Sequence, residues 1–213
     1  MDTEREKQVV ADGYDAIADA FAAWSEAVVD PVRDRLFDRF CDMLPTGASV
    51  LDIGCGSGVP WTRRLADRCA VVVGVDISPV QAEAARHNVP TADIRTGDVM
   101  ALHMPEQSMD GVVALYATGH LPAAEHEALL LRITGWLRPG GILLASFPAG
   151  IDVGWTGEWL GAPMFFSGLG TDAYRRLLAA GDWDVLADEE ALVREPDGEA
   201  RFLWIIARRQ PRA

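Results

Sequence analysis

The first 46 residues carry apolar side chains at the spacing of amphipathic helices. Between Glu4 and Trp24 these side chains recur every three or four positions, which places them on one side of a helix. A second helix is predicted to begin after Pro31 and to end at the run Pro45-Thr46-Gly47. We expect the two helices to form an N-terminal cap over residues 1–46.

The period changes after this cap. Residues 49–53 and 70–76 are short, continuous apolar runs, and the sequence between them is compatible with a helix. Parallel strands that helices cover on both faces read as continuous rather than alternating apolar runs. The two runs therefore predict a unit of strand, helix and parallel strand.

Strands and helices continue to alternate as far as residue 147. The further elements predicted in this part are over 79–87, 92–95, 111–116, 123–137 and 141–147. After a helix at 171–180, residues 183–192 and 200–208 are typical of an antiparallel pair joined by a turn at 195–198. The pattern predicts a doubly wound, Rossmann-like α/β fold with helices on both faces and a C-terminal antiparallel hairpin, in a single domain over residues 1–213.

The composition narrows the classes of function. A formal net charge of −13 disfavours binding to DNA, RNA or anionic membranes. No apolar run reaches the ~20 residues of a membrane-spanning helix, and the charged N-terminal stretch differs from a signal peptide, so we expect a cytoplasmic protein. Cys41, Cys55 and Cys69 have neither disulfide nor zinc-ligand spacing, and no metal site is predicted.

A glycine-rich turn follows the first predicted strand, in the run Asp52-Ile53-Gly54-Cys55-Gly56-Ser57-Gly58. Glycines allow positive φ angles and let a ligand lie against the backbone near a helix N-terminus. Asp76 ends the second predicted strand, a position from which a carboxylate can accept both hydroxyls of a ribose. The two features predict a nucleotide site. A nicotinamide dinucleotide is the weaker alternative, because Val59 puts the third glycine of that fingerprint out of register.

Four motifs resemble those of the class I S-adenosylmethionine-dependent methyltransferases and follow the order found in that family. They are VLDIGCGSG, VVVGVDISP, TGDVMALHMPEQSMDGVVALYATGHLP and LRPGGILLASFP. The resemblance covers essentially the whole chain. It implies a seven-stranded sheet with a reversed last strand, S-adenosylmethionine as cofactor and S-adenosylhomocysteine as product.

The resemblance also implies roles for residues of the expected pocket. Asp76 would bind the ribose, Ile77 would pack on the adenine and Asp98 would lie near the adenine amino group. Tyr14 matches a tyrosine near the methionine carboxylate, although simple packing of its helix on the sheet is an equal alternative. Asp52 would orient the glycine turn. The expected cofactor contacts are Tyr14, Asp52, Gly54, Cys55, Gly56, Gly58, Asp76, Ile77, Asp98, Val99 and Leu115.

The loop 116–122 follows the fourth predicted strand, at the sheet edge where doubly wound folds bind ligands. Methyl transfer from a sulfonium needs alignment, exclusion of water and removal of a proton from the acceptor. His120 is the candidate general base, because an imidazole of pKa ~6.5 is poised near neutral pH. The alternative, that His120 only bonds the backbone before a helix, stays open.

Residues 148–170 form a long connection with many aromatic side chains and six glycines. Long connections over an α/β sheet commonly serve as lids, so we expect this segment to cover an apolar or aromatic acceptor. A plug at the sheet edge or a dimer contact is the open alternative. The expected acceptor contacts are Trp24, Tyr116, Trp155, Trp159 and Phe166.

The leading hypothesis is methyl transfer to an oxygen, nitrogen or carbon atom of a small, partly apolar metabolite. The alternatives are a catalytically silent module that binds the cofactor, and a methyltransferase that acts on protein or RNA. The acidic charge disfavours RNA, and the complete set of acids and glycines disfavours a silent module. Whether the protein forms a homodimer is left open.

Overall fold

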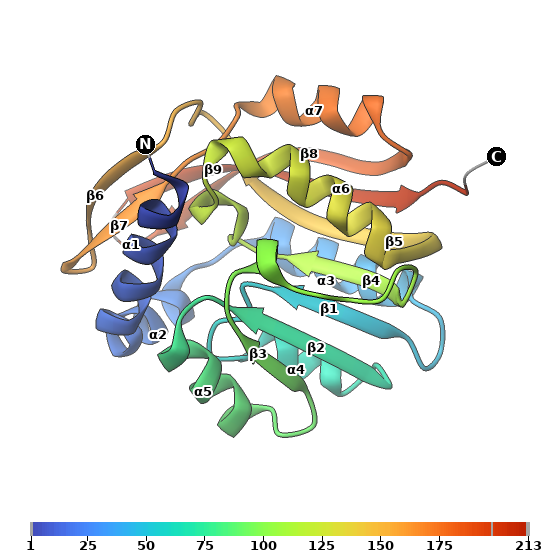
Figure 1. Cartoon of the computed structure of the whole chain (residues 1–213), viewed down its shortest axis with the longest axis horizontal. Helices are drawn as coiled ribbons and strands as arrows, with labels where there is room; N and C mark the ends of the chain where they lie inside the picture. Colours follow the sequence, from blue (N-terminus) through green and yellow to red (C-terminus); the bar gives the residue numbers. More distant parts are fainter. Residues whose placement is uncertain (1, 197, 212–213) are drawn as a thin grey trace.

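The computed structural model describes residues 2–196 and 198–211, and its largest feature is a seven-stranded sheet. The strands of this sheet are β1 Ser49–Ile53, β2 Val71–Asp76, β3 Asp93–Thr96, β4 Met109–Ala114, β5 Leu137–Pro148, β8 Trp183–Glu195 and β9 Gly198–Arg209. Their order is β3-β2-β1-β4-β5-β9-β8 (Figure 1). β1 to β5 run parallel, whereas β9 lies antiparallel between β5 and β8. The predicted α/β fold with a reversed last strand is confirmed.

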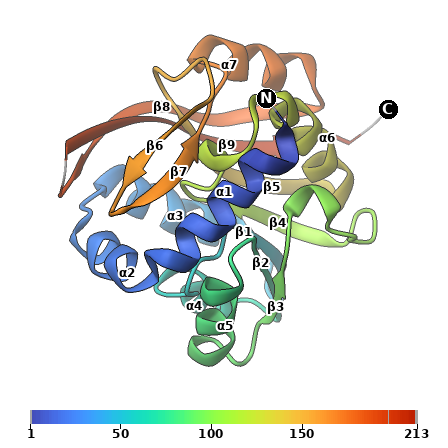
Figure 2. The same cartoon turned by 60° about the vertical axis from the view of Figure 1, so that its left-hand side comes forward.

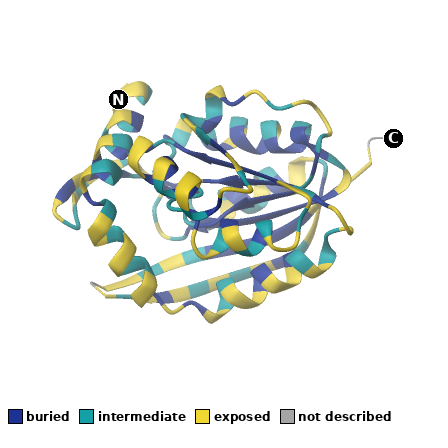
Figure 3. Ribbon diagram, turned by 90° about the horizontal axis from the view of Figure 1, so that it is seen from below, coloured by how far each residue is buried: buried dark blue, intermediate teal, exposed yellow. Residues whose placement is uncertain are grey.

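Helices cover both faces of this sheet. The helices are α1 Thr3–Ala16, α2 Ala18–Ala27, α3 Pro31–Met43, α4 Trp61–Ala66, α5 Pro79–Asn88, α6 His126–Trp136 and α7 Thr171–Ala180. Of these, α3 to α7 lie on the faces, whereas α1 and α2 lie at the carboxyl ends of the strands. Apolar side chains of α6 and α7 share one buried cluster with β1, β4 and β5, while α3 and α4 share another with the opposite face. Figure 3 shows the strands buried between helices whose outer sides are exposed.

The predicted helix from Glu4 to Trp24 is in fact two helices, α1 and α2, separated at Ile17. Ile17 leaves helical geometry with φ −103° and ψ 11°, and its side chain is buried. The bend lets Ile17 stay with the apolar residues under α1 while Phe21 and Trp24 on α2 face a cleft. In Figure 2, α1 crosses in front of the sheet, between β7 and α5.

The predicted lid contains regular structure that the sequence analysis did not expect. Within 148–170, β6 Trp155–Trp159 and β7 Ala162–Phe166 form a two-stranded antiparallel sheet, here called the lid hairpin. Leu160 and Gly161 join its strands, and both have positive φ angles, of 52° and 90°. Two such residues make the tight turn whose twist suits a hairpin, and leucine rarely adopts that conformation.

Smaller differences concern the ends of elements. β4 ends at Ala114 rather than Tyr116, because Tyr116 has a positive φ of 59° and turns out of the strand. α6 begins at His126, after a turn of 3-10 helix over Ala123–Glu125. β8 and β9 run three and one residues beyond their predicted ends, and of the predicted turn 195–198 the residue Asp197 lies outside the described residues. Two further 3-10 turns are Val99–Ala101 and Thr118–His120.

Within the part of the chain that the structure describes, every helix falls short of the length and apolarity that crossing a membrane would require.

The close packing of α3 on β4 can be tested by substitution of a glycine. A Cβ atom on Gly111 of β4 would lie 2.6 Å from Cζ of Phe40, a buried residue of α3. Gly111→Ala should therefore lower the free energy of unfolding by about 1–3 kcal/mol through overpacking. Gly135 of α6 has no atom within 4 Å of the same position, so Gly135→Ala should be neutral or stabilising by up to about 1 kcal/mol. The free energy of unfolding is measured by urea denaturation. An equal decrease in both variants would contradict this packing.

Candidate functional site

A cleft of about 1090 Å³ lies at the carboxyl ends of β1, β2 and β4. Its floor is the glycine turn after β1 and the loops after β2 and β4, and α1, α2 and the lid hairpin form its roof (Figures 1 and 2). This is the sheet edge at which doubly wound folds bind ligands. The volume lies slightly above the range of most small-molecule sites, roughly 300–1,000 Å³.

The glycine turn after β1 is bonded to the end of β2. The amides of Gly54 and Cys55 both donate to the Val75 carbonyl, at 2.8 and 3.1 Å. Gly54, at φ 68°, allows the loop after β4 to approach, since a Cβ on it would lie 2.5 Å from the Cβ of Ala117. Gly56, at φ 54°, opens toward the cleft, where the nearest atom to an added Cβ would be 3.9 Å away.

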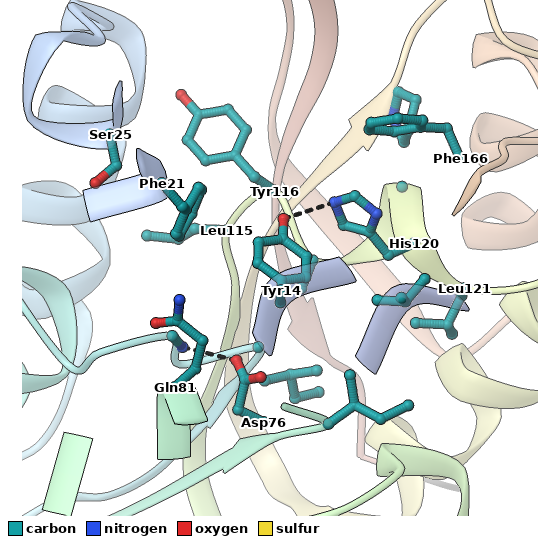
Figure 4. A pocket seen from close by; sticks show the side chains of 18 of the residues that line it. Tyr14, Phe21, Ser25, Asp76, Gln81, Leu115, Tyr116, His120, Leu121 and Phe166 are labelled. Carbon is teal, nitrogen blue, oxygen red and sulfur yellow. Dashed lines mark hydrogen bonds between the residues drawn. The ribbon is translucent and has the colours of Figure 1, made fainter. Parts of the chain in front are cut away.

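Asp76 closes β2 and is held on both carboxylate oxygens by backbone amides. Gly56 N donates to Oδ2 at 2.8 Å and Ser78 N donates to Oδ1 at 2.9 Å. Figure 4 shows the Asp76 carboxylate with one of its hydrogen bonds. Each oxygen has further lone pairs, and the residue lines the cleft. Burial raises the pKa of Asp76 to about 6, although these two amide bonds act in the opposite direction.

Asp52 lies deeper, on β1. Its Oδ2 accepts a hydrogen bond of 2.7 Å from the Thr62 hydroxyl, and both side chains are buried. Burial raises the pKa of Asp52 to about 7, the Thr62 bond lowers it in part, and the nearby Asp76 raises it further. Two carboxyl groups of the cleft thus titrate close to neutral pH, as is common where ligands bind.

Asp98 is not an isolated acid in this structure. Its Oδ2 lies 2.7 Å from Nζ of Lys7 on α1, and its Oδ1 accepts the amide of Met100 at 2.8 Å. The same ammonium lies 2.7 Å from Oε1 of Glu125. Burial lowers the pKa of Lys7, but the bonds to Asp98 and Glu125 outweigh burial and keep it above its ordinary value. The ammonium therefore fixes α1 to the loop after β3.

His120 is bonded through both ring nitrogens. Nδ1 lies 2.9 Å from the carbonyl oxygen of Phe165, and Nε2 lies 2.8 Å from the hydroxyl of Tyr14 (Figure 4). A carbonyl only accepts, so Nδ1 carries the proton; burial lowers the pKa of His120 to about 4, so the ring is neutral and Nε2 accepts from Tyr14. Burial raises the pKa of Tyr14, which keeps its proton. The lone pair that a general base needs is already used in this arrangement.

Aromatic rings form the wall of the cleft under the lid hairpin. Trp159 lies edge to face with Trp24 at 5.1 Å between centroids, and Trp155 stacks on Phe166 at 5.0 Å. Trp155 is 46% exposed, so part of its side chain is open to solvent. Tyr116 also lines the cleft, and its hydroxyl donates to Oδ2 of the buried Asp30 at 2.6 Å.

The structure brings together nearly all the residues predicted for the site. The predicted residues that line the cleft are Tyr14, Trp24, Asp52, Gly54, Cys55, Gly56, Asp76, Ile77, Asp98, Val99, Leu115, Tyr116, His120, Trp155, Trp159 and Phe166. Gly58 is the exception, because it faces α5, where an added Cβ would lie 3.0 Å from Val89 and 3.3 Å from Ala85. Its role here is close packing of the helix.

Some lining residues were not found by sequence reasoning. Lys7 precedes Val10 by three positions, and Phe21 follows Tyr14 by seven. This spacing puts both on the helix side that carries the apolar residues, and it could have indicated them. Gln81 and Glu125 come from α5 and from the turn before α6, and no local pattern distinguishes them. In the described part of the chain, no group of three or more His, Cys, Asp or Glu side chains could hold a metal ion.

Comparison with known proteins agrees with this geometry. The family model described as a methyltransferase domain matches residues 50–141. The 27-O-demethylrifamycin SV methyltransferase of Amycolatopsis mediterranei is 35% identical over 167 residues, which are 67% of this chain and 61% of that protein. A trans-aconitate 2-methyltransferase of Methylobacterium radiotolerans is 33% identical over 180 residues, 74% of this chain and 66% of that protein. The chain thus spans about three fifths to two thirds of the length of these relatives.

Among solved structures, an S-adenosylmethionine-dependent methyltransferase of Methanosarcina mazei has the same fold. Its TM-score is 0.71 at 16% identity, over 86% of this chain and 99% of that chain. The sheet order, the glycine turn with Asp76 and the matches in sequence lead to one family. The chain belongs to the class I S-adenosylmethionine-dependent methyltransferases.

Proposed function

We propose that the protein transfers a methyl group from S-adenosylmethionine to an oxygen, nitrogen or carbon atom of a small, partly apolar metabolite. The observation that carries this proposal is the cleft itself. One side of it holds the glycine turn and Asp76, the other side is walled by aromatic rings, and both lie under one roof. A cofactor site continuous with an apolar chamber is what transfer between two bound molecules requires.

The residues of the cleft suit the nucleoside and amino-acid parts of S-adenosylmethionine. Asp76 keeps free lone pairs for the ribose hydroxyls, and the space beside Gly56 allows a ligand to approach the backbone. Ile77 and Val99 provide apolar contact for an adenine, with Asp98 at its edge. Tyr14 and Asp52 face the part where the methionine moiety would lie. When bound, S-adenosylmethionine supplies an electrophilic methyl group on a sulfonium.

The acceptor would occupy the chamber under the lid hairpin. Trp24, Trp159 and Phe166 offer apolar faces, and Tyr116 is held in place by Asp30. Flat rings of this kind bury an apolar or aromatic molecule and exclude water from it. Alignment and exclusion of water account for most of what such a transfer needs, because the methyl donor is already reactive.

Removal of the proton from the acceptor requires a free base in the cleft. His120 is the histidine that lines the cleft, but it can accept a proton only if Tyr14 releases Nε2. A silent binding module is disfavoured by the intact acids and glycines, and the roofed cleft favours a small acceptor over a protein or RNA.

Removal of the Asp76 charge tests the cofactor half of the cleft. The ribose hydroxyls donate to a carboxylate, and each such charge-assisted bond contributes about 1.5–3 kcal/mol. Asp76→Asn should therefore weaken S-adenosylhomocysteine binding by roughly tenfold or more, measured by calorimetry. Asp67→Asn, at an exposed acid at the end of α4, is the matched control and should bind normally.

The pKa of about 6 at Asp76 also predicts a pH dependence with opposite signs for binding and for stability. Binding needs the carboxylate, so the affinity should fall as the pH drops below about 6. Ligand-free stability should instead rise over the same range, because a carboxyl whose pKa is raised by folding stabilises the fold most when protonated. Both slopes should be smaller in Asp76→Asn, and an unchanged binding slope in that variant would remove Asp76 from the ribose site.

Transfer itself is tested with S-adenosylmethionine that carries a labelled methyl group. The protein is incubated with extracts of small molecules, with protein and with RNA in separate reactions. We expect label in the small-molecule fraction, and label reduced at least tenfold when Asp76→Asn replaces the wild type. If S-adenosylhomocysteine binds but no fraction gains label, the protein is a binding module and the proposed transfer is wrong.

A further inference from the structure

The roof of the cleft has a small apolar core of its own. Val10 and Ile17 on the α1 side and Ala162, Met164 and Phe165 of β7 form one buried cluster, separate from the two clusters on the faces of the sheet. α1 and the lid hairpin therefore pack on each other as one unit rather than as two independent flaps.

Contact within this unit extends to the backbone. A Cβ on Gly13 of α1 would lie 2.7 Å from the carbonyl oxygen of Pro163 and 2.8 Å from Cε of Met164. Only a residue without a side chain allows α1 to approach β7 so closely. We therefore expect α1 and the hairpin to move together.

His120 bonds both parts of this roof. It belongs to the turn after β4, in the body of the sheet, and Figure 4 shows its ring directed at Tyr14. Nε2 accepts from Tyr14 of α1, and Nδ1 donates to the carbonyl of Phe165 of β7. Phe166 also lies against this ring, at 5.0 Å between centroids.

The two parts have further anchors on their outer sides. Asp15 of α1 accepts from the Ser78 hydroxyl at 2.5 Å and from the Val80 amide at 3.1 Å. On the hairpin side, the Ser167 amide donates to the Gly119 carbonyl at 2.8 Å. These bonds hold each part to the body separately, whereas the imidazole lies between the parts.

We infer that His120 is a positioning residue, which holds α1 and the lid hairpin closed together and so makes retention of the cofactor and alignment of the acceptor depend on one imidazole. The inference rests on the proposed function for the identity of the two ligands. In this role His120 acts through its two hydrogen bonds and does not take up a proton. Binding under α1 should therefore also order the hairpin.

Four variants separate this role from that of a base. His120→Phe fills the space but removes both bonds. His120→Gln keeps an acceptor near the place of Nε2 but cannot take up a proton. Tyr14→Phe removes only the hydroxyl. His87→Phe, at an exposed histidine of α5, is the matched control.

The test measures hydrogen exchange of backbone amides and the dissociation constant of S-adenosylhomocysteine. In wild type, S-adenosylhomocysteine should slow exchange in both 3–16 and 155–166. In His120→Phe it should slow exchange less than in wild type in both segments, and it should bind about fivefold more weakly, the factor that the one hydrogen bond lost to α1 contributes. His120→Gln should remain within about twofold of wild type, and Tyr14→Phe should add nothing to His120→Phe in the double variant.

Several results would overturn the inference. Hairpin protection that persists undiminished in His120→Phe would show that the two parts do not close through the imidazole. A His120→Gln variant as defective as His120→Phe would indicate a need for a titratable group. If wild type fails to bind S-adenosylhomocysteine, the proposed function fails, yet the ligand-free protein still decides the inference. There His120→Phe must speed exchange in both 3–16 and 155–166, and His87→Phe in neither; a change in only one segment overturns it.

Discussion

The hydrogen bonds between the glycine turn and the end of β2 set the geometry of the whole cleft. Gly54 and Cys55 donate to Val75, and Gly56 donates to Asp76, so the turn cannot move without the strand beside it. Because these partners are backbone groups and one acid, the bonds that shape the floor form without any contribution from a ligand. The loop after β4, with Ala117 against Gly54, is in turn placed by that floor.

The burial of two acids in this cleft costs electrostatic free energy. Asp52 and Asp76 are buried acids in a chain of net charge −13, and burial raises the pKa of each. On α1, Lys7 pairs with two other acids of the cleft, Asp98 and Glu125. A ligand with a positive charge and hydroxyl donors would relieve this cost.

Much of the fold was predictable from the chain because the parallel strands are continuous apolar runs and the turns between them carry glycine. Asp76 and the turn at Gly54 were found for the same reason: their roles depend on local sequence. The lid hairpin was not found, because its turn uses Leu160 at a positive φ, where the sequence rules expect glycine or asparagine. The bonds from His120 to Tyr14 and Phe165 join residues far apart in the chain. Local sequence patterns do not predict such contacts.

The separate apolar core between α1 and β7 affects how the molecule can move. Opening of the roof as one unit must break its polar anchors, among them those of Lys7 and Ser167, but it leaves the large clusters on the two faces of the sheet intact. Fewer contacts break in such an event than in global unfolding. The strands and the floor of the cleft would keep their places while the roof opens.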